Sequence, residues 1–197
     1  MGRLSKFSPF ARAIGVMGVT AGLVTGVTFA SFNTNSVVLA DSDLVVTSDV
    51  LRISNGGAYS STSVAGFSDN LNPGVEGPKH NFYLQNTSTS NLKISVAVAA
   101  DSGDIQGSGI HFKFYNEAGA LVGEATYDQI HNTPGTLNGQ LNAGAQGTAD
   151  GTPTEGDYSY TVTVDQAAMP GSNGQVTDYD LTFTGTSLDT PDSQPTL

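Results

Sequence analysis

The sequence predicts an all-β protein, an antiparallel β-sandwich preceded by a signal peptide. Three observations support this fold class. Apolar and polar residues alternate with the strand period in several short stretches. Gly, Pro and Asn residues that favour turns separate these stretches. Gly, Ser, Thr and Asn are abundant whereas Lys, Glu and Leu are few, which disfavours helices. Seven or eight such strands predict two facing sheets, each with one buried face.

The first 30 residues have the layout of an export signal. Arg3, Lys6 and Arg12 form a basic start without acidic residues, and an uncharged, glycine-rich apolar run follows from Ile14 to Ala30. This run is short for a span of the ~20 residues that a bilayer requires, and its glycines weaken a permanent helix. A cleaved signal is therefore favoured over a retained anchor.

The predicted cleavage site lies between Ala30 and Ser31. Small residues that suit a peptidase pocket occur at Thr28 and Ala30, and Val38 and Ala40 offer a second candidate site farther from the apolar run. We therefore expect a secreted protein that contacts the membrane only during export.

Composition restricts the partners of the exported chain. The 197-residue chain has a formal net charge of −11, with 7 basic and 18 acidic residues. Removal of the three basic residues of the signal leaves 4 against 18, a net charge of −14. Such a surface repels nucleic acid and anionic membranes, so neither is an expected partner. The chain has no cysteine, so burial and sheet hydrogen bonds must stabilise it without disulfides.

The predicted sandwich domain spans residues 44–187. Its first segment, residues 45–53, is interpreted as one long strand or two short strands with a break near Asp49. A turn at residues 55–57 and a polar loop at residues 58–69 follow.

A proline-glycine turn precedes the densest strand pattern. Pro73 fixes φ and Gly74 supplies the positive φ of a type II turn. Residues 79–84 and 92–98 then alternate between apolar and polar side chains. Two half-buried antiparallel strands joined through residues 86–91 are expected here.

A hairpin and a long loop are expected next. Residues 110–114 alternate, residues 116–119 favour a hairpin loop, and residues 121–127 form the return strand. Residues 128–156 predict a long loop with room for one short strand. Its candidate core residues are Ile130, Leu137 and Leu141.

Two further strands, residues 158–164 and 179–184, close the domain, and residues 188–197 predict a flexible tail. Tyr158, Tyr160 and Tyr179 share the apolar phase of these strands. Their hydroxyl groups would be satisfied either by water at sheet edges or by a ligand in a groove. No helix is predicted beyond the signal.

Two short motifs lie in the first half of the chain. The apolar run ends in the sequence F-A-S-F-N at residues 29–33. A polar turn followed by a strand contains Asn70, Leu71, Pro73, Gly74, Phe82 and Asn86. Together these motifs resemble the TasA/camelysin family, secreted proteins of bacteria and archaea whose signals are often cut by a SipW-type peptidase. The resemblance covers residues 14–98.

This resemblance implies a jelly-roll-like sandwich and a role as a fibre or biofilm-matrix subunit, in the extracellular matrix or at the cell surface. Family fibres are assembled by donor-strand complementation, in which a segment after the cleavage site fills a groove in a neighbouring copy. Residues 31–43 would be that arm, since an added strand gains main-chain hydrogen bonds and side-chain pockets. Its apolar anchors would be Phe32, Val37, Val38 and Leu39. The implied partners are copies of the chain itself and a SipW-type signal peptidase.

Little in the sequence supports a catalytic activity. Some family members are described as metalloproteases, but His80, His111 and His131 are the three histidines, and no two are four residues apart. No G-x-S-x-G motif or cysteine supports a hydrolase. We therefore expect no enzymatic activity and no catalytic metal.

Calcium is the one cofactor that the sequence leaves open. Its candidate ligands are Asp101, Asp104, Asp150, Glu155 and Asp157. Calcium takes oxygen ligands in flexible geometry, but no EF-hand spacing exists, and exposed acidic loops are usually solvated. No cofactor is predicted.

Three functions are thus compared. The first is a structural, non-enzymatic subunit of an extracellular fibre or matrix. The second is a monomeric secreted adhesion or ligand-binding module, which the absence of tryptophan disfavours for sugar stacking. The third is a camelysin-type metalloprotease, which the missing zinc motif disfavours.

Overall fold

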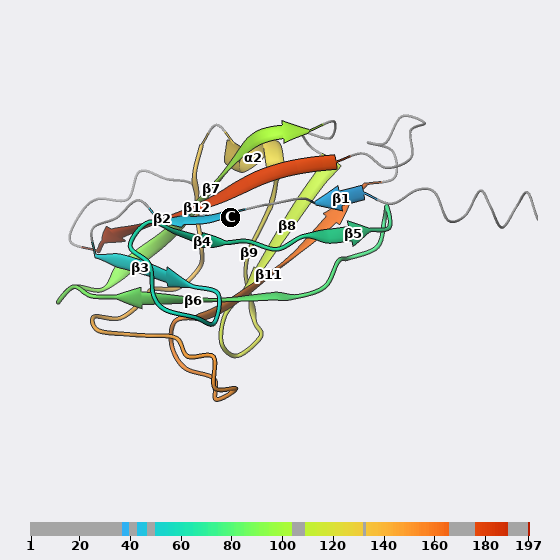
Figure 1. The fold of residues 1–197 in the computed structure, drawn as a ribbon. Coiled ribbons are helices and arrows are strands. Elements are labelled where there is room, and N and C mark those ends of the chain that lie inside the picture. Colours follow the sequence, from blue (N-terminus) through green and yellow to red (C-terminus); the bar gives the residue numbers. More distant parts are fainter. Residues whose placement is uncertain are drawn as a thin grey trace, which may run out of the picture. The chain divides into compact units, whose positions relative to one another are not determined.

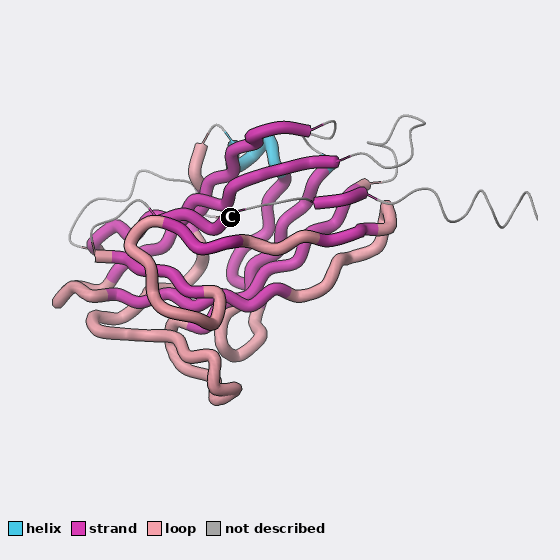
Figure 2. The backbone as a smooth tube through the Cα atoms, in the orientation of Figure 1, coloured by secondary structure: helices cyan, strands magenta, loops and turns pink. Residues whose placement is uncertain are grey.

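Strands in two sheets make up most of the computed structural model (Figures 1 and 2). The structure describes residues 37–39, 43–46, 50–103, 109–131, 133–165, 176–188 and 197. The predicted signal peptide, the cleavage site at Ala30 and Ser31, and Phe32 lie outside these residues. No described helix is long and apolar enough to cross a bilayer.

The strands are β1 (Val37–Leu39), β2 (Asp43–Val46), β3 (Leu51–Ser54), β4 (Ser63–Ala65), β5 (Asp69–Leu71), β6 (His80–Asn86), β7 (Leu92–Gly103), β8 (Ile110–Tyr115), β9 (Leu121–Thr126), β10 (Gly135–Thr136), β11 (Asp157–Val164) and β12 (Val176–Ser187). One short helix, α2 (Tyr127–His131), follows β9.

The strands form a seven-stranded and a five-stranded sheet. The seven-stranded sheet has the order β10-β7-β12-β1-β5, and β2 pairs with both β12 and β4. The five-stranded sheet has the order β3-β6-β11-β8-β9. The described strands pair antiparallel, except that β1 and β2 both run parallel to β12.

Aromatic side chains from the two sheets meet in one core. The rings of Phe82 on β6 and Phe183 on β12 lie 4.7 Å apart, and those of Phe112 on β8 and Tyr179 on β12 lie 5.3 Å apart. These contacts join the inner faces of opposite sheets, so the predicted all-β sandwich is confirmed. The finer jelly-roll topology stays a prediction.

Several local predictions are confirmed. The segment at 45–53 is two strands, β2 and β3, which belong to different sheets. Gly74 has a φ of +76°, and the Val75 amide donates to the Asn72 carbonyl at 3.0 Å, as a type II turn requires. The hairpin between β8 and β9 also forms, with Gly119 at a φ of +72°.

The expected pairing of residues 79–84 with 92–98 is wrong. These residues form β6 and β7, which lie in opposite sheets, and β6 pairs with β3 and β11 instead. The connection after Asn86 therefore crosses from one sheet to the other. Alternation of apolar and polar residues indicates that one face of a strand is buried. It does not show whether two such strands pair in one sheet or pack face to face in two.

The loop predicted at residues 58–69 contains two strands. β4 pairs with β2, and the start of β5 at Asp69 pairs with Leu39 of β1. Each has three residues and little apolar character, because backbone hydrogen bonds hold an edge strand even where its side chains are polar.

The prediction that no helix follows the signal is also wrong. The amide of Thr126 donates to Gln129 Oε1 at 2.7 Å, and the amide of Gln129 donates to Thr126 Oγ1 at 3.4 Å. This reciprocal pair is a capping box, which starts the one-turn helix α2. The T-x-x-Q spacing was the sequence signal. The predicted core residues of the long loop are confirmed, because Ile130, Leu137 and Leu141 are all buried.

The tyrosines do not lie at sheet edges. β11 is the central strand of its sheet, and β12 is flanked on both sides. Tyr158, Tyr160 and Tyr179 are all buried, so the edge interpretation is wrong.

One residue of the predicted tail packs against the sandwich. Leu197 lies over Gly123 and Gly135, and its amide donates to the Thr136 carbonyl at 3.1 Å. Residues 189–196 lie outside the described part. The end of the tail thus contacts the core, which a sequence without apolar periodicity did not predict.

Candidate functional site

Residues 37–39 of the predicted arm form β1, which lies between β12 and β5 (Figure 1). Val38 is paired in parallel with Val176 and antiparallel with Asn70. In the described part of the sheet, β5 is an edge strand whose partner is β1. β1 therefore occupies a groove between two strands that would otherwise be separated.

The next strand, β2, continues along β12 but is part of the core. Leu44 is paired with Leu181, and Leu44 and Val46 are buried whereas Val45 is half-buried. The Asp43 amide also donates to Asp180 Oδ1 at 3.1 Å, which ties the start of β2 to β12. β1 and β2 therefore both run along β12, and β2 is anchored by buried side chains.

The outer wall of the groove is fixed to the opposite sheet. The Asp69 carboxylate on β5 is hydrogen-bonded to the His80 ring on β6, and both side chains are nearly buried. Phe67, just before β5, stacks on the His80 ring at 4.3 Å. These contacts hold β5 in place independently of β1.

The residues of the family-like turn motif divide between two places. Asn70 and Leu71 lie on β5 beside β1, and Leu71 also enters the core. Phe82 lies at the centre of the core. The structure therefore places part of the motif next to the arm strand.

Asn86, the last residue of the motif, organises the sheet-to-sheet crossing. Its side chain is 1% exposed. Its Nδ2 donates to the carbonyls of Ser90, Leu141 and Asn142 at 2.8, 3.2 and 3.0 Å, and its Oδ1 accepts from the Ser88 amide at 2.9 Å. One buried amide group thus links three loop carbonyls, each of which also accepts from a second donor.

The three histidines lie in separate environments. His80 pairs with Asp69, as above. His111 Nε2 lies 3.0 Å from Asp165 Oδ2, and His131 Nδ1 lies 3.2 Å from the Val98 carbonyl. Among the described residues, no three His, Asp or Glu side chains gather as metal ligands would.

The candidate calcium ligands are used within their own loop. Asp157 Oδ1 accepts from the Thr148 amide at 2.7 Å, and Glu155 Oε1 accepts from the Asn142 amide at 2.6 Å. Hydrogen bonds, first of all from the Thr152 amide, hold the pKa of Asp150 below its ordinary value. Asp104 lies outside the described residues, and of Asp101 the backbone alone is described.

A polar network covers part of the outer face of the five-stranded sheet. Glu76 Oε1 accepts from Thr161 Oγ1 at 2.7 Å and from the Tyr115 hydroxyl at 3.1 Å, and Glu76 Oε2 accepts from Lys113 Nζ at 3.1 Å. The Thr161 hydrogen bond, followed by that of Lys113, lowers the pKa of Glu76. The turn that carries Glu76 is thereby tied to the sheet.

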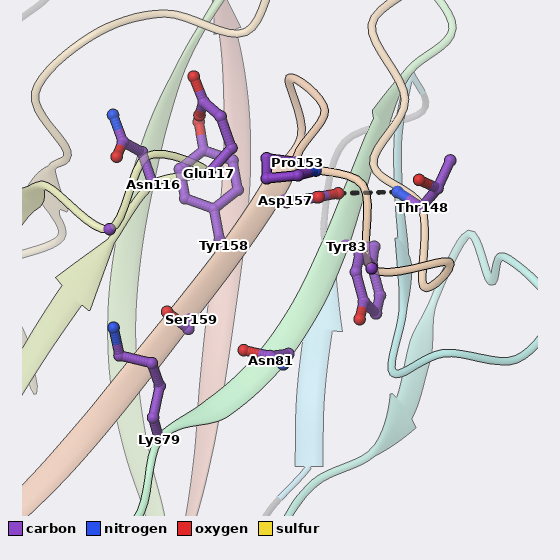
Figure 3. A pocket seen from close by; sticks show the side chains of 12 residues that line it. Lys79, Asn81, Tyr83, Asn116, Glu117, Thr148, Pro153, Asp157, Tyr158 and Ser159 are labelled. Carbon is purple, nitrogen blue, oxygen red and sulfur yellow. Dashed lines mark hydrogen bonds between the residues drawn. The ribbon is translucent and has the colours of Figure 1, made fainter.

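A cavity of about 230 Å³ lies beside this network, over β6 and β11 (Figure 3). Its floor carries Asn81, Tyr83 and Ser159, its rim carries Glu117 and Pro153, and Lys79 lies at one end. Sequence reasoning did not find it, because its residues come from two strands and two loops that are far apart in the chain.

Comparison with known proteins adds no relative. No protein-family model matches the chain, and no curated protein has significant similarity to it. The resemblance to TasA/camelysin proteins therefore rests on the short motifs described above.

Proposed function

We propose that this protein is a structural, non-enzymatic subunit of an extracellular fibre or matrix, whose copies join by exchange of the strand β1. In the polymer, residues 37–39 of one copy fill the groove between β12 and β5 of the next copy. The implied partners are further copies of the chain and a SipW-type peptidase that frees the arm during export.

The observation that carries this proposal is the placement of β1. It is a three-residue strand inserted between two others, its backbone makes the pairing, and residues 40–42 separate it in the chain from the core strand β2. A strand supplied by a second copy makes the same hydrogen bonds in the same groove. Strand exchange of this kind changes the partner at little cost in contacts.

Exchange of β1 between copies would keep the burial energy of its side chains. Full burial of the Val37, Val38 or Leu39 side chain would contribute about 1.5–3 kcal/mol each, in either the folded-back or the exchanged state. The two states therefore differ little, and the concentration of the protein favours exchange. The Asp69–His80 pair keeps β5 attached to β6, so the acceptor groove persists when β1 leaves.

Deletion of residues 31–39 tests the proposal. The shortened chain keeps β2 and the core, so it should fold and unfold cooperatively, but it should form no fibres in electron micrographs after prolonged incubation. A synthetic peptide of residues 31–39, added in excess to the intact protein, should stop growth. If the truncated chain polymerised at the rate of the intact chain, β1 would not be the donor strand.

A point variant provides a matched control for the deletion. Val38→Pro removes an amide hydrogen from the centre of β1 and should prevent both pairings. Val38→Thr keeps the amide and favours a strand, and should assemble like the original protein. Equal fibre formation by both variants would contradict the proposal.

The position of the cleavage site also tests strand exchange by β1. N-terminal sequencing of secreted protein should begin at Ser31. A start at Asp41 would remove β1 from the exported chain and would leave the acceptor groove without a donor. The adhesion or ligand-binding function would then be favoured, and the cavity over β6 and β11 is the observation that supports it.

A further inference from the structure

The cavity over β6 and β11 has a floor that the sheet register defines. Asn81 is directly opposite Ser159, and Tyr83 is directly opposite Asp157. Alternate residues of a strand share one face, so these two cross-strand pairs lie side by side on the outer face of the sheet. Figure 3 shows Asn81 and Ser159 between Lys79 and Tyr83 on this floor.

The loop that forms one wall is held rigid by its own hydrogen bonds. Asp157 accepts from the Thr148 amide at 2.7 Å and from the Thr154 amide at 3.0 Å. Gly147 lies against the Gly156 backbone so closely that a Cβ would not fit. The Leu84 amide donates to the Gly156 carbonyl at 2.8 Å, which ties the loop to β6. The wall is therefore formed before any ligand binds.

The opposite wall is the hairpin between β8 and β9. Asn116 Oδ1 accepts from the amides of Ala118 and Ala120 at 3.2 and 2.9 Å, which fixes the turn that carries Glu117. Two preformed walls reduce the conformational entropy that the protein loses when a ligand binds.

The floor offers polar groups that the protein does not use. Within the described residues, the side chains of Asn81, Tyr83 and Ser159 make no hydrogen bond, although Ser159 is 6% exposed. Burial raises the pKa of Tyr83, and burial also raises that of Tyr158 at the rim to about 12. Both phenols are hydrogen-bond donors at neutral pH, as an ordinary tyrosine is, and they lie beside an amide and a hydroxyl group.

Two neighbouring cavities extend this surface. One, of about 270 Å³, shares Tyr83 and Thr148 with the first and reaches Tyr59. The other, of about 300 Å³, shares Asn116, Glu117 and Tyr158. Each is at or below the lower end of the range for a compact organic ligand, ~300–1,000 Å³. Three small, open cavities that adjoin through shared lining residues fit a linear ligand with one ring in each.

We propose that the three adjoining cavities bind a neutral oligosaccharide, with Asn81, Tyr83 and Ser159 as the hydrogen-bonding floor. The hydroxyl groups of a sugar match the free amide and hydroxyl groups, and the tyrosine rings supply apolar surface for its C–H faces. Among the described residues that line the three cavities, Lys79 is the one cation, and its Nζ lies 4.1 Å from the Tyr115 ring. Glu117 and Asp157 border the first cavity, so an anionic sugar is disfavoured.

The direct test is an NMR titration of ¹⁵N-labelled protein with cellotetraose, maltotetraose, N-acetylchitotetraose and, as the anionic probe, tetragalacturonate. At least one neutral tetrasaccharide should cause saturable shifts at the amides of Asn81, Tyr83, Thr148 and Ser159. The anionic probe should cause none there. No saturable shift with any neutral probe, or equal binding of the anionic probe, would overturn the proposal.

Substitutions in the cavity floor test where the tetrasaccharide binds. Asn81→Ala and Ser159→Ala should each raise the Kd by roughly tenfold, since each removes one partner of the ligand. Thr186→Ala on the other sheet is the control and should leave the Kd unchanged. Thermal melts verify that each variant folds. Folded floor variants that bind as tightly as the original protein would refute the assignment.

This site is independent of strand exchange. The chain that lacks residues 31–39 should bind the same tetrasaccharide with the same Kd, because none of the described residues that line the cavities belongs to β1. Loss of binding in that folded variant would contradict the location proposed.

Discussion

The two sheets are held together in different ways. The five-stranded sheet is antiparallel, and its central strand β11 pairs with β8 over six residues while alternate side chains enter the core. The flank of the seven-stranded sheet beyond β12 consists instead of β1, β2, β4 and β5, each of three or four residues. It depends on backbone pairing and a few side-chain anchors.

This difference indicates where the molecule opens. Regions with few buried apolar contacts open at lower free energy than the core does. The flank around β1 and β5 should therefore open without unfolding of the rest, which strand exchange requires. The five-stranded sheet should open only in global unfolding. Four predictions test this contrast, in order of decreasing effect.

The largest effect is expected at the core that both sheets share. Phe183 is fully buried on β12 and contacts Phe82 and Phe114 of the opposite sheet. Phe183→Ala should lower the free energy of unfolding by about 3–5 kcal/mol, measured by chemical denaturation. Val75→Ala, at a side chain that is 56% exposed, should change it by less than about 0.5 kcal/mol. Similar values for the two would place Phe183 outside a packed core.

The next effect concerns the crossing between the sheets. Asn86→Ala removes a buried donor to the carbonyls of Ser90, Leu141 and Asn142, each of which keeps a second donor, and removes the acceptor of the Ser88 amide. The change should cost about 2 kcal/mol. The matched control is Asn138→Ala, at an exposed amide. If denaturation gave the two variants equal stability, the crossing would not depend on this side chain.

A smaller, local effect is expected in the flank. Asp69→Asn weakens the nearly buried pair with His80 and should cost about 1 kcal/mol, with faster amide exchange in β1 and β5 than in β11. Asp165→Asn alters the exposed pair with His111 and should cost less. Uniformly faster exchange across both sheets would show that the flank does not open separately.

The smallest effect is the pH response of Glu76. Its pKa is lowered in the folded state, so its contribution to stability is complete above the ordinary Glu value of about 4.3. This contribution is lost as the pH falls through the lowered folded value. The Tm measured against pH should therefore decline less steeply below that point in Glu76→Gln. A steeper decline in the variant would reverse the sign of this linkage.

The sequence by itself determined the fold class and several elements. Alternation identified the long strands of the core, and Pro73 and Gly74 predicted their turn correctly because the φ values of these residue types are restricted. The hairpin after β8 followed from similar turn chemistry. For the functional sites, the sequence pointed to residues 37–39 only through the family resemblance.

The tertiary structure alone decided which strands pair and where free polar groups gather. Alternation of apolar and polar residues indicates a buried face but not the neighbouring strand. The sequence therefore placed β6 and β7 in one sheet, whereas they lie in different sheets. The short strands β4 and β5 form because neighbouring backbones accept their hydrogen bonds, which leaves little trace in side-chain patterns. The sugar-binding floor joins Asn81 to Ser159, residues that are distant in the chain and adjacent only through the register of β6 and β11.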